Sequence, residues 1–380
     1  MRKKLEFQAD RIEAVLTLHK VPARVTGGTV TPRWVRFQVL PALGAKISRI
    51  KGLSEELAAA LDATSCRISR RGAAVDVEVP RDDPQPVRLL PLYDQLTTQS
   101  TNQPVIPPIT AILGLAEDGA PLLIRLPSPD VAHILVAGTT GSGKTVLLQT
   151  MILSLAMTNS PVCSSASPEQ GLALVLIDPK GHAFKPFDKL AHLARPVIWR
   201  VEQAAEALQS LVRLMERRGN PNSSKSHATV VVVIDELADL LMVGGKPVKR
   251  ALTRLTQRGR EASIHIVAAT QKPTASVLGP LIKANFPVRL VGRVTSAEDA
   301  RTATGWSGTG AERLIGRGDF VAVAEGRVTR FQVAHVSPSE ARDVAARLPS
   351  ALALLPPQAP GKMRTRASKL VEVLKGGMSR

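Results

Sequence analysis

The sequence predicts an α/β fold, with a mainly parallel, doubly wound sheet in a large domain and a small α+β domain before it. Three observations lead to this prediction. Short β-branched runs alternate with longer helical patterns, which is typical of parallel strands joined by helices. These runs are apolar throughout, as expected when helices cover both faces of a sheet. The N-terminal residues lack that alternation and combine helical and strand-like segments instead.

A small N-terminal domain is expected at residues 1–105. A helical pattern begins at Leu5, strand-like residues follow at 34–40, and an apolar stretch at 53–61 again has a helical pattern. The polar segment 97–108, which contains two consecutive prolines, has the composition of a linker. These segments predict an α+β unit that ends near residue 105.

The larger domain is expected at residues 106–337. Its strands are predicted from apolar runs at 132–137, 172–177, 230–234, 264–269 and 288–294. A helix is predicted over 338–348, at the start of a third segment, 338–380, that continues as a tail rich in Lys and Arg. That tail is either a tether or a basic arm, and it could contact DNA or a protein partner.

The composition is strongly basic. Lys and Arg number 50 against 32 Asp and Glu, and the formal net charge of +18 predicts a polyanionic partner. A compositional bias of the genome is the alternative explanation. Aromatic residues make up only 3% of the chain, which argues against a protein that stacks single-stranded bases on aromatic side chains. The composition therefore favours the backbone of double-stranded DNA as the partner.

The cysteines and the apolar segments bear on the compartment. Cys66 and Cys163 lie far apart and have no partners at metal-binding or redox spacing. The N-terminus has no apolar stretch of signal-peptide length, and the sequence has no run of about eighteen apolar residues. We therefore expect a chain in the reducing cytoplasm that does not insert into a membrane.

The strongest motif is Gly138-Thr139-Thr140-Gly141-Ser142-Gly143-Lys144-Thr145, which fits G-x-x-x-x-G-K-[ST] and lies between an apolar strand and a helical pattern. Its glycines let the backbone turn so that its N–H groups point at phosphate oxygens, next to the positive end of the helix dipole. Lys144 is expected to contact the β and γ phosphates, and Thr145 to give its hydroxyl to Mg²⁺. The motif predicts ATP and Mg²⁺ as cofactors.

A second element of the site follows the apolar run 230–234. That run ends in Asp235 and Glu236, at the strand end where ligands of open α/β sheets bind. Asp235 is expected to hold Mg²⁺, and Glu236 to polarise the attacking water. The alternative is that the two acids only stabilise the start of the next helix. The pair predicts hydrolysis, because binding alone does not need Glu236.

Two further strands end in polar side chains, Asp178 after one run and Gln271 after another. In a parallel sheet these ends face the same crevice. Gln271 could orient water or sense the γ phosphate, whereas Asp178 could equally cap the turn before Pro179. We favour Gln271 over Asp178 as a catalytic residue.

Several uncommon motifs resemble, in order, those of the FtsK/SpoIIIE family of DNA translocases. They lie at residues 138–145, 230–240 (VVVVIDELADL), 264–273 (IHIVAATQKP), 281–287 (LIKANFP), 295–301 and 310–320. Residues 30–61 look like the family's α domain, so the resemblance covers roughly residues 5–335. It implies a RecA-like P-loop ATPase motor (β) domain behind that α domain.

The resemblance also implies an assembly and a substrate. Members of the family form hexameric rings around duplex DNA, so a homo-hexamer is expected here. The family's channel loops correspond to Thr270, Lys272 and Lys283, with Arg301 a weaker candidate, and a motor that tracks any sequence should grip phosphates through such residues. Lys272 stands where the family usually has arginine.

A family arginine that reaches the nucleotide of the neighbouring subunit matches Arg260. Such an arginine finger would couple hydrolysis to the geometry of the ring. Arg258 is two residues away and could take that role instead.

The resemblance is confined to the soluble motor domains. No segment resembles the family's membrane anchor, and the residues after Val336 are too few for its winged-helix γ domain. An ATP-driven translocase of double-stranded DNA is therefore the leading hypothesis. The alternatives are an FtsK-like ATPase of a protein secretion or conjugation machine and an ATP-switched DNA-binding module that does not translocate.

Overall fold

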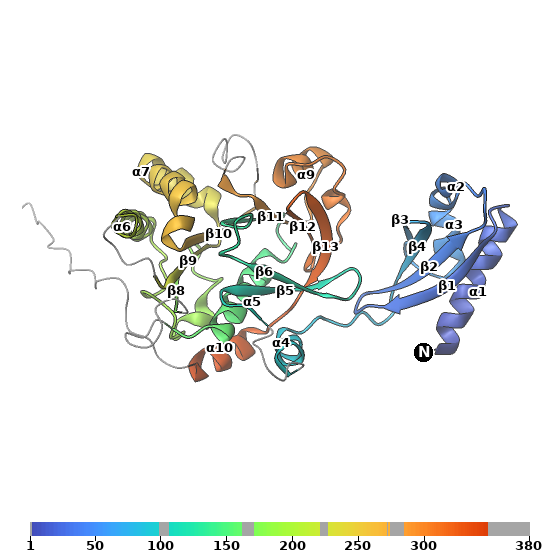
Figure 1. Ribbon diagram of the computed structural model, residues 1–380, viewed down its shortest axis with the longest axis horizontal. Coiled ribbons are helices and arrows are strands. Elements are labelled where there is room, and N and C mark those ends of the chain that lie inside the picture. Colours follow the sequence, from blue (N-terminus) through green and yellow to red (C-terminus); the bar gives the residue numbers. More distant parts are fainter. Residues whose placement is uncertain are drawn as a thin grey trace, which may run out of the picture.

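Two sheets organise the protein (Figure 1). The computed structural model describes residues 2–98, 106–161, 171–220, 227–271, 273 and 285–348. Among these residues lie a four-stranded antiparallel sheet near the N-terminus and a nine-stranded mixed sheet. This arrangement confirms the predicted α/β fold class with a smaller N-terminal unit.

The N-terminal sheet has the strand order β1-β2-β4-β3. Its strands are β1 (Ala23–Val30), β2 (Trp34–Pro41), β3 (Arg67–Arg71) and β4 (Ala74–Pro80), and its helices are α1 (Arg2–Leu18), α2 (Ile47–Gly52) and α3 (Ser54–Ala60). Ile12 and Leu16 of α1 pack with Leu57 of α3 and Val77 of β4 in a separate apolar core. The α3 helix and the β2 strand fall where the sequence predicts them.

The parallel half of the large sheet consists of the five apolar runs that the sequence predicts. They are β7 (Ile134–Ala137), β8 (Leu172–Ile177), β9 (Thr229–Ile234), β10 (Ile264–Thr270) and β11 (Val288–Gly292), in the order β11-β7-β10-β9-β8. Successive residues face opposite sides: Val231 and Val233 join one core cluster, and Val230 and Val232 join another. Both faces are therefore buried, which explains why the runs are apolar throughout.

Four antiparallel strands extend the sheet beyond what the sequence predicts. They are β5 (Thr110–Ala116), β6 (Pro121–Arg125), β12 (Asp319–Ala324) and β13 (Arg327–Val333), in the order β6-β5-β13-β12 next to β11. The β12–β13 hairpin closes through Glu325 and Gly326, both with positive φ, as a tight two-residue turn requires. Much of β13 is exposed or half-buried, so it lacks the apolar signal of the parallel strands.

Helices cover both faces of the large sheet (Figure 1). One face carries α6 (Val201–Arg218) and α7 (Leu237–Arg258); the other carries α5 (Lys144–Thr158), α4 (Leu89–Thr98) and α10 (Pro338–Arg347). Further helical segments among the described residues are α9 (Ala297–Thr304), η2 (Lys185–Phe187), η3 (Arg260–Ala262) and η4 (Ala311–Arg313). No helix in the described ranges is long and apolar enough to span a membrane.

Along the chain, residues begin to pack in the core of the large sheet before the expected domain boundary at residue 105. Leu89 and Leu92 of α4 are buried in the core of the large sheet, whereas β4 ends the N-terminal sheet at Pro80. Residues 81–88, which we call the connector, join the two cores. The linker residues 99–105 and the basic tail from residue 349 lie outside the described residues.

Two buried histidines link the start of the central strands. His133 Nδ1 accepts a hydrogen bond of 3.0 Å from the backbone N–H of Ile266, and His265 Nδ1 lies 2.8 Å from the carbonyl oxygen of Ala132. Burial lowers the pKa of His133 to about 3, and nearby His265 adds to this shift. His133 is therefore neutral in the folded protein.

This neutral histidine makes stability depend on pH. Because the unfolded chain protonates His133 near pH 6.5, we expect the free energy of unfolding to fall as pH decreases from about 6.5 toward about 3, with a limiting slope of about 1.4 kcal/mol per pH unit. Urea unfolding at several pH values measures this slope. His133→Gln, which keeps an acceptor and cannot titrate, should have the shallower slope; equal slopes would contradict the assignment.

Candidate nucleotide-binding site

The glycine-rich loop connects β7 to α5 at the carboxyl edge of the parallel strands. Gly138, Gly141 and Gly143 have φ values of 148°, 79° and 105°, which disfavour residues with a side chain. At Gly143 a Cβ atom would lie 2.7 Å from the backbone nitrogen of Gly318. Glycine is thus required there both by the backbone conformation and by a close neighbour.

Lys144 opens α5 with its side chain folded along the loop. Its Nζ donates hydrogen bonds of 2.8 and 3.0 Å to the carbonyl oxygens of Gly138 and Thr139. Burial lowers the pKa of Lys144, while the nearby carboxylates of Glu236 and Asp235 oppose that shift. The ammonium group is held inside the loop, where phosphate oxygens could replace the carbonyl acceptors.

The next residue, Thr145, faces the end of β9. Its Oγ1 lies 3.3 Å from Oδ1 of Asp235. Burial raises the pKa of Asp235, and the neighbouring Asp178 and Glu236 raise it further. A hydroxyl and a crowded carboxylate beside a phosphate loop are the hard oxygen donors that Mg²⁺ prefers, so these two residues fit the predicted metal.

Glu236 and Gln271 meet at the ends of β9 and β10. Glu236 is only 3% exposed, and its carboxylate accepts hydrogen bonds of 3.2 and 3.3 Å from the backbone N–H of Gln271. Lys180 Nζ lies 3.7 Å from the same carboxylate. The Gln271 side chain accepts a bond of 3.1 Å from the Thr140 hydroxyl. A buried carboxylate and an amide therefore lie next to the phosphate loop.

Asp178 has the other role that the sequence left open for it. It is completely buried, and its two carboxylate oxygens accept hydrogen bonds from the backbone N–H groups of Gly181, Ala183 and Phe184. These bonds hold the turn that follows β8. In this conformation the carboxylate stabilises the loop and raises the pKa of Asp235.

A cavity of about 600 Å³ lies beside the phosphate loop, and Lys144, Thr145, Asp235 and Gln271 all line it. The sequence did not single out several of its other residues: Arg33, residues 84–87, Gln332, Val333 and His335. Arg317, also in the wall, lies inside the segment 310–320 that carries the family resemblance. Arg33 lies inside the segment 30–61 that resembles the family's α domain, but nothing in that resemblance connects it to the nucleotide site of the other domain.

A turn formed by Gly316, Arg317 and Gly318, which we call the GRG turn, supports the phosphate loop from outside. The backbone N–H groups of Arg317 and Gly318 donate to the carbonyl oxygens of Gly141 and Ser142, at 3.0 and 2.8 Å. The carbonyl oxygen of Gly318 in turn accepts 2.8 Å from the N–H of Val333. The turn thus connects the phosphate loop to β13.

The predicted DNA-contacting residues lie in different environments. Thr270 is the last residue of β10 and its side chain is completely buried in this conformation, so a contact between Thr270 and DNA stays a prediction. Arg301 is exposed on α9. Lys272 and Lys283 lie outside the described residues.

Arg260 and Arg258 are both exposed near the amino end of β10. The cavity lies at the carboxyl end of that strand, and neither arginine lines it. The two arginines are therefore far from the nucleotide site of their own chain.

Comparison with known proteins identifies the family. Residues 99–221 and 219–275 match the model of the FtsK/SpoIIIE family, and residues 1–81 match that of the FtsK alpha domain. The chain belongs to the FtsK/SpoIIIE family. This confirms the resemblance that the sequence motifs indicate.

Two curated relatives of this FtsK/SpoIIIE chain are named DNA translocase FtsK. The protein from Sporosarcina ureae is 34% identical over 369 residues, which cover 90% of this chain and 45% of the relative. The one from Bacillus anthracis is 35% identical over 367 residues, covering 88% and 44%. The chain thus spans less than half the length of the curated relatives it matches.

Two solved structures share the fold. The pCW3 conjugation coupling protein TcpA, in a monomer form with ATPγS, has a TM-score of 0.56 at 20% identity, covering 89% of this chain and 99% of TcpA. The cytoplasmic domain of the type VII secretion ATPase EccC from Thermomonospora curvata has a TM-score of 0.57 at 24% identity, covering 72% and 36%. At these identities they show the fold alone, that of a P-loop ATPase.

The contact between the GRG turn and the phosphate loop can be tested by a glycine pair. We expect Gly143→Ala to raise the dissociation constant of a fluorescent ATP analogue at least about tenfold, because the new Cβ would push Gly318 away. Gly181→Ala is the matched control, since Gly181 also has a positive φ but a Cβ there would have no atom within 4 Å. Equal affinities of both variants would contradict the role of this contact.

Proposed function

We propose that this chain is an ATP-driven motor that translocates double-stranded DNA and works as a ring of identical subunits, expected to be a hexamer. The observation that carries the proposal is a phosphate loop whose Thr145 faces the half-buried Asp235, next to the buried Glu236, in a member of the FtsK/SpoIIIE family. Its relatives named DNA translocase FtsK support DNA as the substrate.

The residues divide the work of ATP hydrolysis between them. Lys144 and the loop N–H groups neutralise and hold the β and γ phosphates. Thr145 and Asp235 would hold Mg²⁺, which when bound neutralises charge that develops on the phosphate oxygens. Glu236 accepts a proton from the attacking water, and Gln271 orients that water from the adjacent strand end.

The position of Arg260 favours hydrolysis between subunits. Because Arg260 lies near the amino end of β10, it does not line the cavity of its own chain. A neighbouring subunit in a ring could present the same arginine to this cavity and stabilise charge on the γ phosphate. Arg258, on the same exposed stretch, is the alternative finger. Either arginine would make the rate depend on ring assembly.

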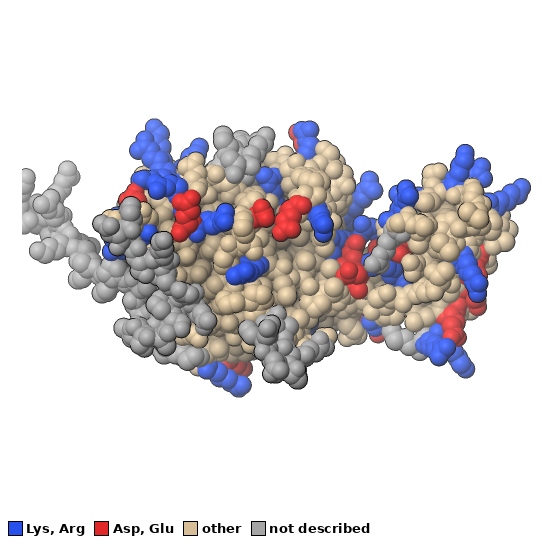
Figure 2. Space-filling view, viewed as in Figure 1, with Lys and Arg blue, Asp and Glu red and all other residues tan. Residues whose placement is uncertain are grey.

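The charge of the chain supports a backbone grip on DNA. The formal net charge is +18, and Figure 2 shows Lys and Arg side chains spread over both domains on the face in view. We propose that Lys272, Lys283 and Arg301 contact phosphates, which would let the motor move along any sequence. The basic tail would add to this grip or bind a protein partner. We propose that the chain works in the cytoplasm.

The proposal predicts ATP hydrolysis that duplex DNA stimulates. Because phosphate contacts release counterions, we expect the stimulation to weaken steeply as salt rises. Glu236→Gln should bind ATP with little change in affinity and lose at least about a hundredfold in turnover, since it removes the proton acceptor. Asp239→Asn is the matched control, because Asp239 pairs with the same Lys180, yet its side chain is 49% exposed, against 4% for Glu236.

A coupled ATPase assay with linear duplex at low salt checks this prediction. Unchanged hydrolysis on addition of duplex would refute a DNA motor. Stimulation by a client protein and not by duplex would instead support an ATPase of a secretion or conjugation machine.

A further inference from the structure

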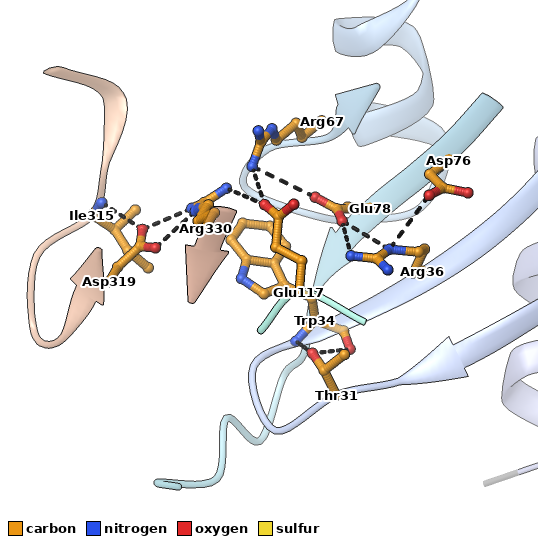
Figure 3. A network of polar contacts seen from close by, with 10 residues as sticks. All are labelled: Thr31, Trp34, Arg36, Arg67, Asp76, Glu78, Glu117, Ile315, Asp319 and Arg330. Atoms are coloured by element: carbon orange, nitrogen blue, oxygen red, sulfur yellow. Dashed lines mark hydrogen bonds and ion pairs between the residues drawn. The ribbon is translucent and has the colours of Figure 1, made fainter. Parts of the chain in front are cut away.

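A ladder of charged side chains joins the two domains (Figure 3). Arg67 of β3 lies 2.7 Å from Glu117, at the end of β5, and 3.8 Å from Glu78 of β4. On the side of the larger domain, Arg330 of β13 lies 3.6 Å from Glu117 and makes a two-bond pair with Asp319 of β12, at 2.7 Å each. Charges on both domains are thus paired across their junction.

The ladder is anchored in the N-terminal sheet and ends at the GRG turn. Within the sheet, Arg36 donates 2.7 and 2.9 Å bonds to the buried Glu78. At the other end, the Asp319 carboxylate accepts a hydrogen bond of 3.1 Å from the backbone N–H of Ile315. Ile315 directly precedes the GRG turn. Since that turn bonds to the phosphate loop, the ladder leads from β4 to the nucleotide site.

Arg33 makes a second and more direct connection. It lies in the turn between β1 and β2. Its Nη1 nevertheless donates a hydrogen bond of 2.7 Å to Gln332 Oε1 and one of 3.4 Å to the carbonyl oxygen of Arg317. Gln332 also donates 3.1 Å to that carbonyl. Within the described residues both bonds of Arg33 use Nη1, so its other N–H groups are available to a ligand in the cavity it lines.

The connector builds another part of the same wall. The backbone N–H of Gln85 donates a hydrogen bond of 2.8 Å to the carbonyl oxygen of Pro32. The backbone N–H of Arg81 donates one of 2.9 Å to the carbonyl oxygen of Arg33. At its far end, the carbonyl oxygen of Val87 accepts 2.7 Å from the N–H of His335. Residues 84–87 line the cavity between these anchors. The cavity is therefore walled by both domains and by the chain that joins them.

The chemistry of this wall fits a nucleotide. Val87, Val146 and Val333 also line the cavity and supply apolar surface for a base. Arg33 and Arg317 supply positive charge, and burial together with the nearby Arg330 and Arg317 lowers the pKa of Arg33, with Asp319 opposing. An anionic ligand would relieve this crowding of like charges.

We propose that bound nucleotide bridges the two domains: Arg33 of the N-terminal domain contacts it directly, and occupancy of the phosphate loop fixes that domain against the ATPase domain. This inference rests on the proposed function, in that ATP occupies the phosphate loop. It extends that function by making the position of the N-terminal domain a response to the nucleotide. In a motor, this would let the hydrolysis cycle move one domain relative to the other.

The first test is nucleotide affinity of the whole chain. We expect Arg33→Ala to weaken binding of ATPγS about tenfold, which corresponds to about 1.4 kcal/mol, because a charged donor to the ligand is lost. Arg33→Lys keeps the charge and loses the planar fork, so its affinity for ATPγS should lie between those of the wild-type chain and Arg33→Ala. It replaces the alanine variant in this test if that variant does not fold. Arg24→Ala, on the exposed face of β1, is the matched control.

The second test measures the bridge itself. Spin labels on Ser48→Cys in α2 and Ser307→Cys after α9, both exposed, report the distance between domains when Cys66 and Cys163 are replaced. We expect saturating ATPγS to narrow the distance distribution in the otherwise wild-type chain and not in Arg33→Ala. A merely structural role of Arg33 would broaden the distribution equally with and without nucleotide.

The outcomes separate this inference from the proposed function. If the wild-type chain binds ATPγS, and Arg33→Ala matches it in affinity and in nucleotide-dependent narrowing, the bridge is refuted while the motor proposal stands. Weaker binding with unchanged narrowing refutes the bridge as well. If the wild-type chain binds no nucleotide, the proposed function itself fails.

Discussion

The nucleotide loop depends on one close backbone contact, the approach of Gly318 to Gly143. Lys144 donates hydrogen bonds to the carbonyl oxygens of Gly138 and Thr139, and the carbonyl groups later in the loop need other donors. The GRG turn supplies those donors to Gly141 and Ser142 and passes the connection on to Val333. The antiparallel strands β12 and β13 therefore do more than widen the sheet, because they hold the turn that holds the phosphate loop.

The residues proposed to act in catalysis lie at a junction of domains. Asp235, Glu236 and Gln271 project from the ends of parallel strands, where a doubly wound sheet collects polar groups. On the other side of the cavity lie Arg33 and the connector. The Arg67–Glu117 pair of the ladder adds orientation more than stability, because both side chains are partly exposed and exposed ion pairs contribute at most about 1 kcal/mol. A partner that alters the contacts at this junction would therefore alter the surroundings of the phosphate loop.

The sequence predicts those parts of the fold and site that local pattern encodes. The five parallel strands are mostly apolar. The phosphate loop and Asp235 directly follow such strands, so the apolar runs and the motifs together locate the site. The half-exposed β13 has no comparable signal. Arg33 and Gln332 meet across 299 residues of chain, which no local motif reports. The family motif gives the position of Thr270 in the sequence, but it does not report that the side chain is buried at the end of β10.

Displacement of a third strand from linear duplex DNA tests translocation most directly. A motor that moves along duplex removes a triplex-forming strand in its path, whereas a nucleotide-switched binder hydrolyses ATP and stays in place. With ATP and Mg²⁺ we expect displacement by the wild-type chain, and none by Lys144→Ala or with ATPγS, because each step requires phosphate binding and hydrolysis. Full duplex-stimulated hydrolysis with the third strand left in place would contradict the claim that this chain is a DNA motor.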